Sequence, residues 1–176
     1  LKAAIETNKQ RLVKICSPAE YFDTNASYDL AILFQPNQSF KPIFDLIKKR
    51  ALNSFIIGGT QTQWAFLNSI QPNFSQEITG QIENYQGEIN STFNTFSVDD
   101  FEFNTYPPLT AEFGDISIDV PHETLVYKSI NGVNTQKPLW FTFETNSQRM
   151  AVLLGENIWK WRMHTFRKDQ NFKSFD

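Results

Sequence analysis

Short apolar runs alternate with amphipathic segments between Leu1 and Ser69. A short, almost wholly apolar run is typical of a parallel strand that is covered on both faces, and apolar residues three to four positions apart are typical of a helix. Strands that alternate with helices predict right-handed βαβ units and a parallel sheet. The predicted helices are Leu1–Gln10, Ser39–Arg50 and Thr60–Ser69, and the predicted strands are Arg11–Cys16, Asp29–Phe34 and Phe55–Ile57.

Beyond Pro72 the pattern changes to short strands separated by turns. Asn131-Gly132 is a dipeptide typical of a tight hairpin. We expect strands over Ile116–Val120, Thr124–Ile130, Leu139–Glu144 and Arg149–Leu154. The prediction is a single α/β domain over residues 1–176, with a mostly parallel central sheet, flanking helices and an antiparallel β extension in the C-terminal half.

Composition narrows the class of protein without identifying a reaction. Aromatic residues make up 15% of the 176 residues and include 17 Phe, which predicts an ordered core. A formal net charge of −3 provides no cationic footprint for nucleic acid. The sequence has no run of about 20 apolar residues that would span a bilayer. Cys16 is the single cysteine, so an intrachain disulfide is excluded.

The candidate site follows the predicted strand Phe55–Ile57. A strand that runs into Gly58-Gly59 and then into a helix start is how α/β proteins form a ligand crevice at the carboxyl edge of a sheet. We expect one glycine to adopt a positive φ, and the amides at the helix start to face solvent, where an anion would bind. Trp64 either overhangs this crevice or packs the helix on the sheet. The predicted ligand-binding residues are Gly58, Gly59, Thr60, Gln61, Thr62 and Trp64.

Four strings in the sequence resemble a domain of uncharacterised bacterial cell-envelope proteins: YDLAILFQP, FIIGGTQTQWAFLN, the YPPL–FG pair and AVLLGENIWKWR. That domain is similar to the class I glutamine amidotransferase-like superfamily, which has a flavodoxin-like fold, and the likeness extends over nearly the whole chain. The resemblance implies an extracytoplasmic, periplasmic domain. Its implied contacts are other modules of the same protein or a protein partner, and it would reach the membrane only through segments outside this chain.

The chain departs from that family in two places. It starts at Leu1, on the predicted first helix, whereas such domains have a strand before this helix. We therefore expect the chain to be part of a longer protein whose upstream residues supply a strand between Arg11–Cys16 and Asp29–Phe34. The loop after Ile57 also contains no cysteine, so the resemblance implies a fold and a location but no catalytic residue.

Residues suited to catalysis are scattered along the sequence. Cys16 lacks the flanking glycines that let a nucleophile project, and we expect it to be buried. His122 and His164 are isolated and give no metal-ligand spacing, so no cofactor or metal is predicted. A glycoside hydrolase would need two carboxylates, and the available acids are Asp115, Asp119, Glu123 and Glu144. The sequence favours a non-catalytic interaction or ligand-binding domain, and a divergent hydrolase acting from the Gly58-Gly59 crevice stays the alternative.

The two tryptophans near the C-terminus also allow two interpretations. Trp159 and Trp161 are two positions apart, and Arg162 follows directly. In the first interpretation the three residues form an exposed edge that docks another module or a glycan. In the second, which we favour, the rings close one end of the sheet and Arg162 is stacked or paired.

Overall fold

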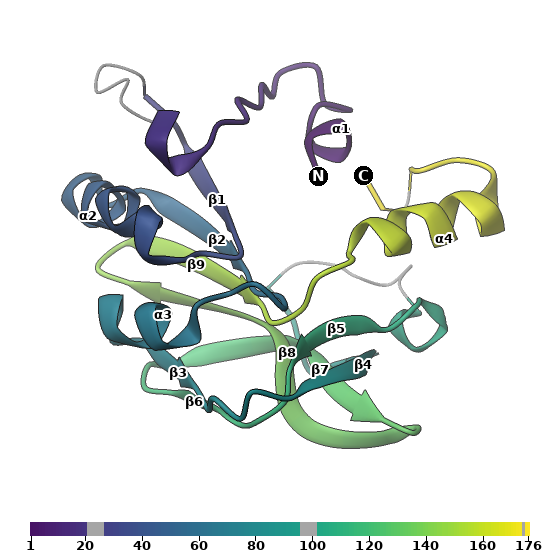
Figure 1. Cartoon of the computed structure of the whole chain (residues 1–176). Helices are drawn as coiled ribbons and strands as arrows, with labels where there is room; N and C mark the ends of the chain where they lie inside the picture. Colours follow the sequence, from purple (N-terminus) through teal and green to yellow (C-terminus); the bar gives the residue numbers. More distant parts are fainter. Residues whose placement is uncertain (21–26, 96–101, 174) are drawn as a thin grey trace.

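The structure is a computed structural model that describes residues 1–20, 27–95, 102–173 and 175–176. Its largest element is a curled seven-stranded sheet in the order β1-β2-β9-β8-β7-β4-β5, beside which β3 pairs with β6 (Figure 1). The strands are β1 Leu30–Phe34, β2 Asn53–Ile57, β3 Phe74–Gln76, β4 Ile82–Ile89, β5 Leu109–Glu112, β6 Ile116–Ile118, β7 His122–Ile130, β8 Val133–Thr145 and β9 Gln148–Leu153.

Helices are short and few in the described part of the chain. The α-helices are α1 Lys2–Ile5, α2 Lys41–Arg50, α3 Trp64–Ile70 and α4 Trp159–Asp169, and the 3₁₀ turns are η1 Pro18–Glu20, η2 Gln38–Phe40 and η3 Phe103–Thr105. In α2 the buried side chains Ile43, Phe44 and Ile47 recur at helical spacing, and Pro42 lies in the first turn, where its missing N–H costs nothing. This helix confirms the prediction from the apolar periodicity.

The predicted parallel strands are present at one end of the sheet. β1 pairs with β2 and β2 pairs with β9, both in parallel, with Leu33 opposite Ile56 and Ile57 opposite Leu153. All three strands are short apolar runs, which is why the sequence predicted them, although in β1 Leu33 alone is buried whereas β2 and β9 bury several aliphatic residues. Their carboxyl ends therefore meet at one edge.

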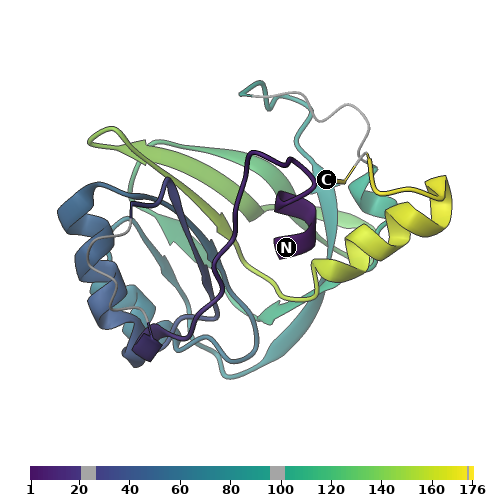
Figure 2. The same cartoon turned by 90° about the horizontal axis from the view of Figure 1, so that it is seen from above.

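The predicted fold class is nevertheless wrong. The pairs β9–β8, β8–β7, β7–β4 and β4–β5 are all antiparallel, so the sheet is a mixed, mostly antiparallel half-barrel rather than a flavodoxin-like or class I glutamine amidotransferase-like sheet. Helices α2 and α3 lie together on one side of the molecule, with Phe44 against Phe66, and α4 lies on the opposite side (Figures 1 and 2). On the sheet itself, Phe55 stacks on Trp140 at 5.7 Å between ring centroids.

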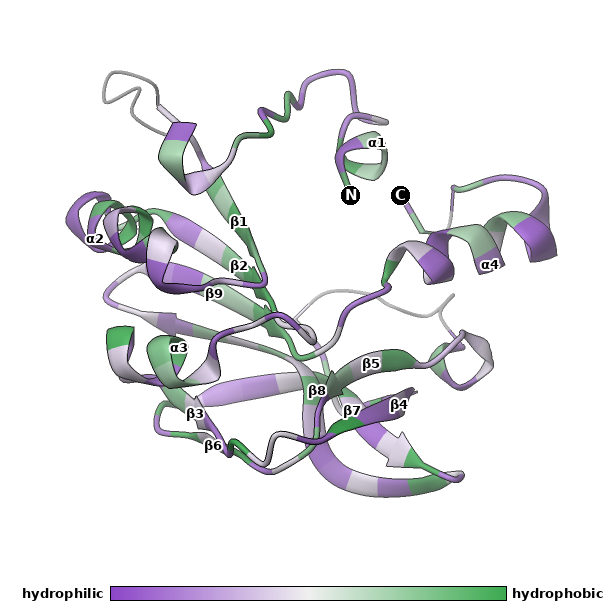
Figure 3. Cartoon of the chain, viewed as in Figure 1, coloured by the Kyte–Doolittle hydropathy of each residue, from purple (hydrophilic) through white to green (hydrophobic). Residues whose placement is uncertain are grey.

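The strand β4 shows why the antiparallel part was underestimated. Its sequence IENYQGEI carries only two buried residues, Tyr85 and Gly87, so no apolar period marks it. Figure 3 shows the difference: β1 is mostly green and β4 largely purple. Backbone pairing with β5 and β7 creates this strand, and backbone groups carry no side-chain signal.

The N-terminal prediction also differs from the structure. The first helix ends at Ile5, and Arg11–Cys16 is not a strand although its residues alternate. Leu12 and Ile15 are 92% and 75% exposed, and Cys16 is exposed rather than buried. An alternating segment becomes a strand only where a second strand accepts its backbone bonds. In the described residues β1, at the sheet's edge, pairs only with β2.

The two C-terminal tryptophans lie on helix α4 but face different sides of it. Trp161 is 1% exposed, contacts Phe103 and Tyr106, and its Nε1–H donates to the Pro107 carbonyl at 2.7 Å. Trp159 is 59% exposed, because residues two apart on a helix point in different directions. The favoured interpretation therefore holds for Trp161 but not for Trp159.

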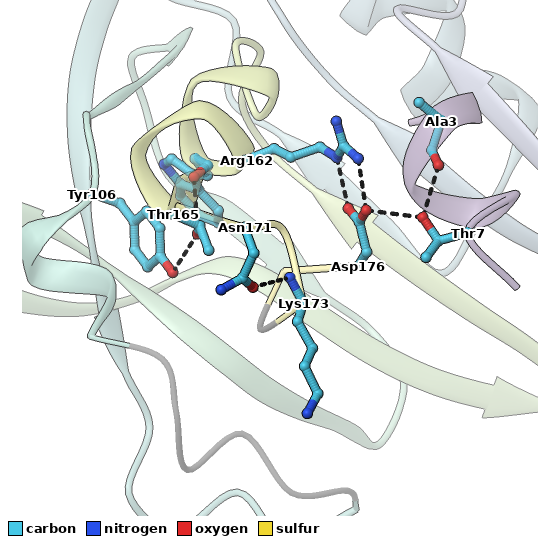
Figure 4. Close-up of polar contacts among 9 residues, drawn as sticks. Ala3, Thr7, Tyr106, Arg162, Thr165, Asn171, Lys173 and Asp176 are labelled. Carbon is cyan, nitrogen blue, oxygen red and sulfur yellow. Dashed lines mark hydrogen bonds and ion pairs between the residues drawn. The ribbon is translucent and has the colours of Figure 1, made fainter. Parts of the chain in front are cut away.

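The tail after α4 folds back against the helix. The Arg162 guanidinium donates to both carboxylate oxygens of Asp176 at 2.6 Å and lies 3.7 Å from the Phe172 ring centroid. Thr7 Oγ1 donates to the same Asp176 carboxylate at 2.9 Å, so this carboxylate joins both ends of the chain (Figure 4). Arg162 is thus both paired and stacked, as the favoured interpretation required.

Replacing each tryptophan should separate a core ring from a surface ring. Trp161→Ala should lower the free energy of unfolding by about 3–5 kcal/mol, the range for emptying a large buried aromatic site. Trp159→Ala should change it by about 0.5 kcal/mol or less, as for other surface positions. Urea unfolding followed by far-UV circular dichroism measures both values. Equal losses for the two variants would show that this assignment of α4 is wrong.

Candidate functional site

The carboxyl ends of β1, β2 and β9 bring together three polar segments that are far apart in the sequence. Gln35 follows β1, Gly58, Gly59 and Thr60 follow β2, and Glu156 lies shortly after β9. Parallel pairing places all of these segments at the same edge of the sheet. We refer to Gln35, Gly59, Thr60 and Glu156 as the carboxyl-edge cluster.

The carboxylate of Glu156 is the centre of this cluster. It accepts a hydrogen bond from the Gln35 side-chain amide. It also accepts from the Thr60 backbone N–H at 3.2 Å and from the Thr60 hydroxyl at 3.2 and 3.3 Å. Glu156 is half-buried, and its own N–H donates to the Thr110 carbonyl at 2.9 Å. The carboxylate is therefore held in place by residues that follow β1 and β2.

The two glycines are required by close packing and not by backbone twist. Neither Gly58 nor Gly59 has a positive φ, so that expectation is wrong. A Cβ on Gly59 would lie 2.5 Å from Gln35 Nε2 and 2.6 Å from Glu156 Oε2. A Cβ on Gly58 would lie 3.0 Å from the Trp64 ring. The absence of side chains here lets the carboxyl-edge cluster close over Gly59 and lets the Trp64 ring pack against Gly58.

Most backbone amides of this turn already have acceptors within the protein. Gly58 N–H donates to the Leu153 carbonyl at 2.8 Å, and Gly59 N–H to Thr62 Oγ1 at 2.9 Å. Thr60 N–H is bonded to Glu156 as described above. The expectation of solvent-facing amides that bind an anion is therefore wrong for Thr60, and also for Thr62, whose N–H donates to the Gly59 carbonyl at 3.1 Å.

The other predicted binding residues have different positions. Trp64 is buried and forms part of the core, so it does not overhang the crevice. Gln61 is exposed. Thr62 acts within the turn as the acceptor for Gly59. The structure thus brings Gly59 and Thr60 to the carboxyl-edge cluster and assigns Gly58 and Trp64 to packing.

Sequence reasoning missed Gln35 and Glu156, which complete the cluster. Gln35 and Glu156 belong to two of the strings that carry the family resemblance, YDLAILFQP and AVLLGENIWKWR, but neither residue had a predicted role. The signal that could have found them is position: Gln35 directly follows an apolar run suited to a parallel strand, and Glu156 follows another such run after one glycine. Applying the carboxyl-edge rule to all three runs would have placed them beside Thr60.

The residues considered for catalysis are not part of this cluster. His122 begins β7 and its Nδ1 is 3.1 Å from the Val120 carbonyl, while His164 lies on α4 against Tyr106. Cys16 is in the N-terminal segment. The considered acids lie elsewhere: Asp115 pairs with Lys137, Glu144 pairs with Arg149, and Asp119 and Glu123 are exposed. Among the described residues, no group of three or more His, Cys, Asp or Glu is arranged to hold a metal ion.

A buried lysine forms a second polar cluster, away from the carboxyl edge. Lys128 on β7 is 3% exposed, its Nζ lies 3.4 Å from the Gly114 carbonyl and 4.5 Å from the Tyr85 ring centroid. The pKa of Lys128 is lowered to about 8, chiefly by burial; nearby Asp115 opposes this change and Lys137 adds to it. The enclosed amine supports the loop at Gly114 and is closed to a substrate.

Comparisons with known proteins identify no family for this chain. No protein-family model matches it, and no curated protein matches it. Its fold is similar to that of STM3548, a protein of Salmonella typhimurium described as cytoplasmic, with a TM-score of 0.52. Only 13% of residues are identical, and the alignment covers 84% of this chain and 68% of that chain. The similarity therefore concerns the fold alone.

The comparison gives no support to the cell-envelope and periplasmic placement that the sequence resemblance implied. The structural relative is described as cytoplasmic, but at 13% identity the likeness shows the fold alone and does not locate this chain. None of the helices in the described ranges is long and apolar enough to cross a membrane. The resemblance to amidotransferase-like domains stays a prediction, although the flavodoxin-like sheet that it implied is not present.

Substituting Gly58 tests the packing of the turn on the core. Gly58→Ala should lower the free energy of unfolding by about 1–3 kcal/mol, because its methyl group would press on the buried Trp64 ring. Combining it with Trp64→Phe should cost less than the two single losses added together, since the smaller ring relieves the contact. Chemical denaturation of the three variants measures this coupling, and strict additivity would contradict it.

Lys128 should make stability depend on pH above neutrality. Its pKa is about 8 in the folded protein and about 10.4 when unfolded, so the unfolded state binds more protons between these values. The free energy of unfolding should therefore rise by up to about 2 kcal/mol between pH 8 and 9.5.

Lys128→Met should remove this rise, whereas Lys49→Met, at an exposed position, should preserve it. Burial raises the pKa of Tyr85, so Tyr85 stays protonated in the folded protein over this window. Urea unfolding at three pH values measures the slope. A slope that persists in Lys128→Met would assign the pH dependence to another group.

Proposed function

We propose that this chain is a non-catalytic ligand-binding domain whose site is the carboxyl-edge cluster. The observation that carries the proposal is the convergence of Gln35, Thr60 and Glu156 from three separate strand ends. A polar side chain held by hydrogen bonds on a rigid sheet edge is suited to binding, because little of its freedom is lost when a ligand arrives. The edge of a parallel sheet is also where α/β proteins bind their ligands.

The cluster favours a neutral or cationic ligand over an anion. The donors of Gln35 and Thr60 are directed at the Glu156 carboxylate, and this carboxylate would repel a second negative charge. A carboxylate has about four lone-pair positions and can accept further hydrogen bonds from a ligand. Exposed Gln61 follows Thr60 in the sequence and half-buried Asn157 follows Glu156, so both add amide groups beside cluster residues. Hydroxyl and ammonium groups are the matching donors.

The alternative of a divergent hydrolase has one supporting observation. The Thr60 hydroxyl donates to Glu156, and Gln35 orients the same carboxylate, which resembles a nucleophile, a base and an orienting group. A hydrolase also needs donors aimed at the developing oxyanion. The nearby amides of Gly58, Gly59 and Thr60 are all engaged within the protein. Binding without catalysis therefore fits the cluster better.

The test is a titration of the isotopically labelled protein followed by its backbone amide resonances. Glucosamine, which combines hydroxyl groups with an ammonium group, should shift the amides of Gln35, Gly59 and Thr60 in a saturable way. Sodium sulfate should leave these amides unchanged. Saturable shifts with sulfate alone, or with neither compound, would contradict the proposed ligand preference.

Two isosteric variants make the assignment specific. Glu156→Gln removes the central negative charge and should weaken glucosamine binding about tenfold, which corresponds to about 1.4 kcal/mol. Glu144→Gln is the matched control, because Glu144 is an exposed carboxylate that lies opposite Arg149 near the start of β9. Equal affinities for the wild type and Glu156→Gln would remove the cluster from the binding site. A released product in the same samples would favour the hydrolase.

A further inference from the structure

The outward side of helix α4 exposes an apolar stripe. Trp159, Met163 and Phe166 are separated by four and three residues, so they lie along one side of the helix. Their exposed fractions are 59%, 40% and 36%. The opposite side of the helix is fixed to the protein by buried Trp161 and Thr165, the latter bonded to the Tyr106 hydroxyl at 3.1 Å (Figure 4). The stripe is therefore held rigidly towards solvent.

A hollow lies between this stripe and the segment before β5. It measures about 220 Å³ and is lined by Pro107, Trp159, Lys160, Met163, His164 and Arg167. Most of its lining surface is apolar, whereas Lys160 and Arg167 bring cationic groups to it. A concave apolar site with charged groups around it is suited to one inserted side chain.

The four cations of α4 differ in whether they have an acidic partner. Arg162 is paired with Asp176 and Lys168 with Glu102. Among the described residues, no carboxylate pairs with Lys160 or Arg167, the two cations that line the hollow. Lys160 only lies over the Trp159 ring, at 6.0 Å from its centroid. Positive charge is thus left uncompensated at the hollow, although the chain as a whole carries −3.

We propose that this face of α4 docks an acidic segment of a protein partner. One large apolar side chain of that segment enters the hollow against Met163 and Trp159, and flanking carboxylates pair with Lys160 and Arg167. Complementary charge gives such a contact its specificity and its association rate. This surface is separate from the carboxyl-edge cluster and does not depend on the ligand proposed there.

An anionic membrane surface fits the same face less well. Membrane-surface helices insert a broad apolar face into the lipid, whereas α4 offers a narrow stripe beside a hollow. The negative net charge of the chain also opposes adsorption to anionic lipid. An acidic peptide segment with one large apolar side chain fits both the concave shape of the hollow and its positive charge.

The probe is a synthetic peptide, DEEDLFDEED, whose central Leu-Phe supplies the anchor. Fluorescence of Trp159 should change in a saturable way on titration, and raising NaCl from 0.05 to 0.5 M should weaken binding at least about tenfold because the contacts are ionic. A peptide with Gly-Ser in place of the anchor, and one with Lys in place of every acid, should not bind. Binding of the Lys peptide, or equal binding without the anchor, would overturn the proposal.

Charge-reversed variants locate the contact. The double variant Lys160→Glu, Arg167→Glu should weaken peptide binding at least about tenfold. The double variant Lys48→Glu, Lys49→Glu makes the same change of net charge at exposed positions on α2, and it should bind as the wild type does. Comparable weakening by both variants would reduce the interaction to net charge and overturn the proposal.

The remaining outcomes are also decisive. Glu156→Gln should leave peptide binding unchanged, so the two proposed surfaces can fail independently. Met163→Asp places a charge in the hollow without altering a cation, so it should weaken peptide binding. Its melting curve shows whether α4 stays folded. No saturable binding by the wild type, stronger binding to phosphatidylglycerol vesicles than to the peptide, or a dimer that buries α4 in solution would each overturn the proposal.

Discussion

Strand β9 is the constraint on which the rest of the structure depends. It pairs in parallel with β2 on one side and antiparallel with β8 on the other, so it joins the two parts of the sheet. Met150, Val152 and Leu153 along it are buried. Because β9 runs parallel to β1 and β2, it ends at the same edge as they do. The chain leaves that edge through Glu156 and enters α4 within a few residues.

Both proposed surfaces depend on the short segment that leads from β9 through Glu156 into α4. Glu156 reaches the ends of β1 and β2 because Gly59 has no side chain to keep Gln35 and the carboxylate away. The same loop then fixes the start of α4, where Trp159 Nε1–H donates to Asn157 at 3.3 Å. Burial of Trp161 sets the rotation of the helix about its axis and leaves Trp159 and Met163 outside. A polar cluster and an apolar stripe are therefore neighbours along the chain but are chemically distinct.

The described polar groups of the carboxyl-edge cluster and those of α4 differ in whether they have a partner within the protein. At the carboxyl edge the donors and the acceptor satisfy one another, so the cluster is stable without a ligand and any ligand must add to existing bonds. On α4 two cations have no acidic partner in the described part of the chain, which leaves attraction for an external charge. Lys128 is a third case: burial lowers the pKa of its amine, which lies against the Tyr85 ring and the Gly114 carbonyl. Its environment stabilises a loop and offers no route for a ligand.

The sequence by itself determined the elements that are marked by a helical apolar period or by a short apolar run. It located α2, β1, β2 and β9, and it identified Gly58-Gly59 as a turn at the carboxyl end of a strand. It did not reveal β4, because that strand depends on backbone bonds to β5 and β7. It also misplaced Arg11–Cys16, whose alternation found no partner among the described strands. Only the tertiary structure decided that the sheet is mostly antiparallel, that Gln35 and Glu156 join Thr60, and that Trp159 is exposed while Trp161 is buried. Local periodicity reports which side of a segment is apolar, whereas strand pairing and helix rotation depend on residues far away in the chain.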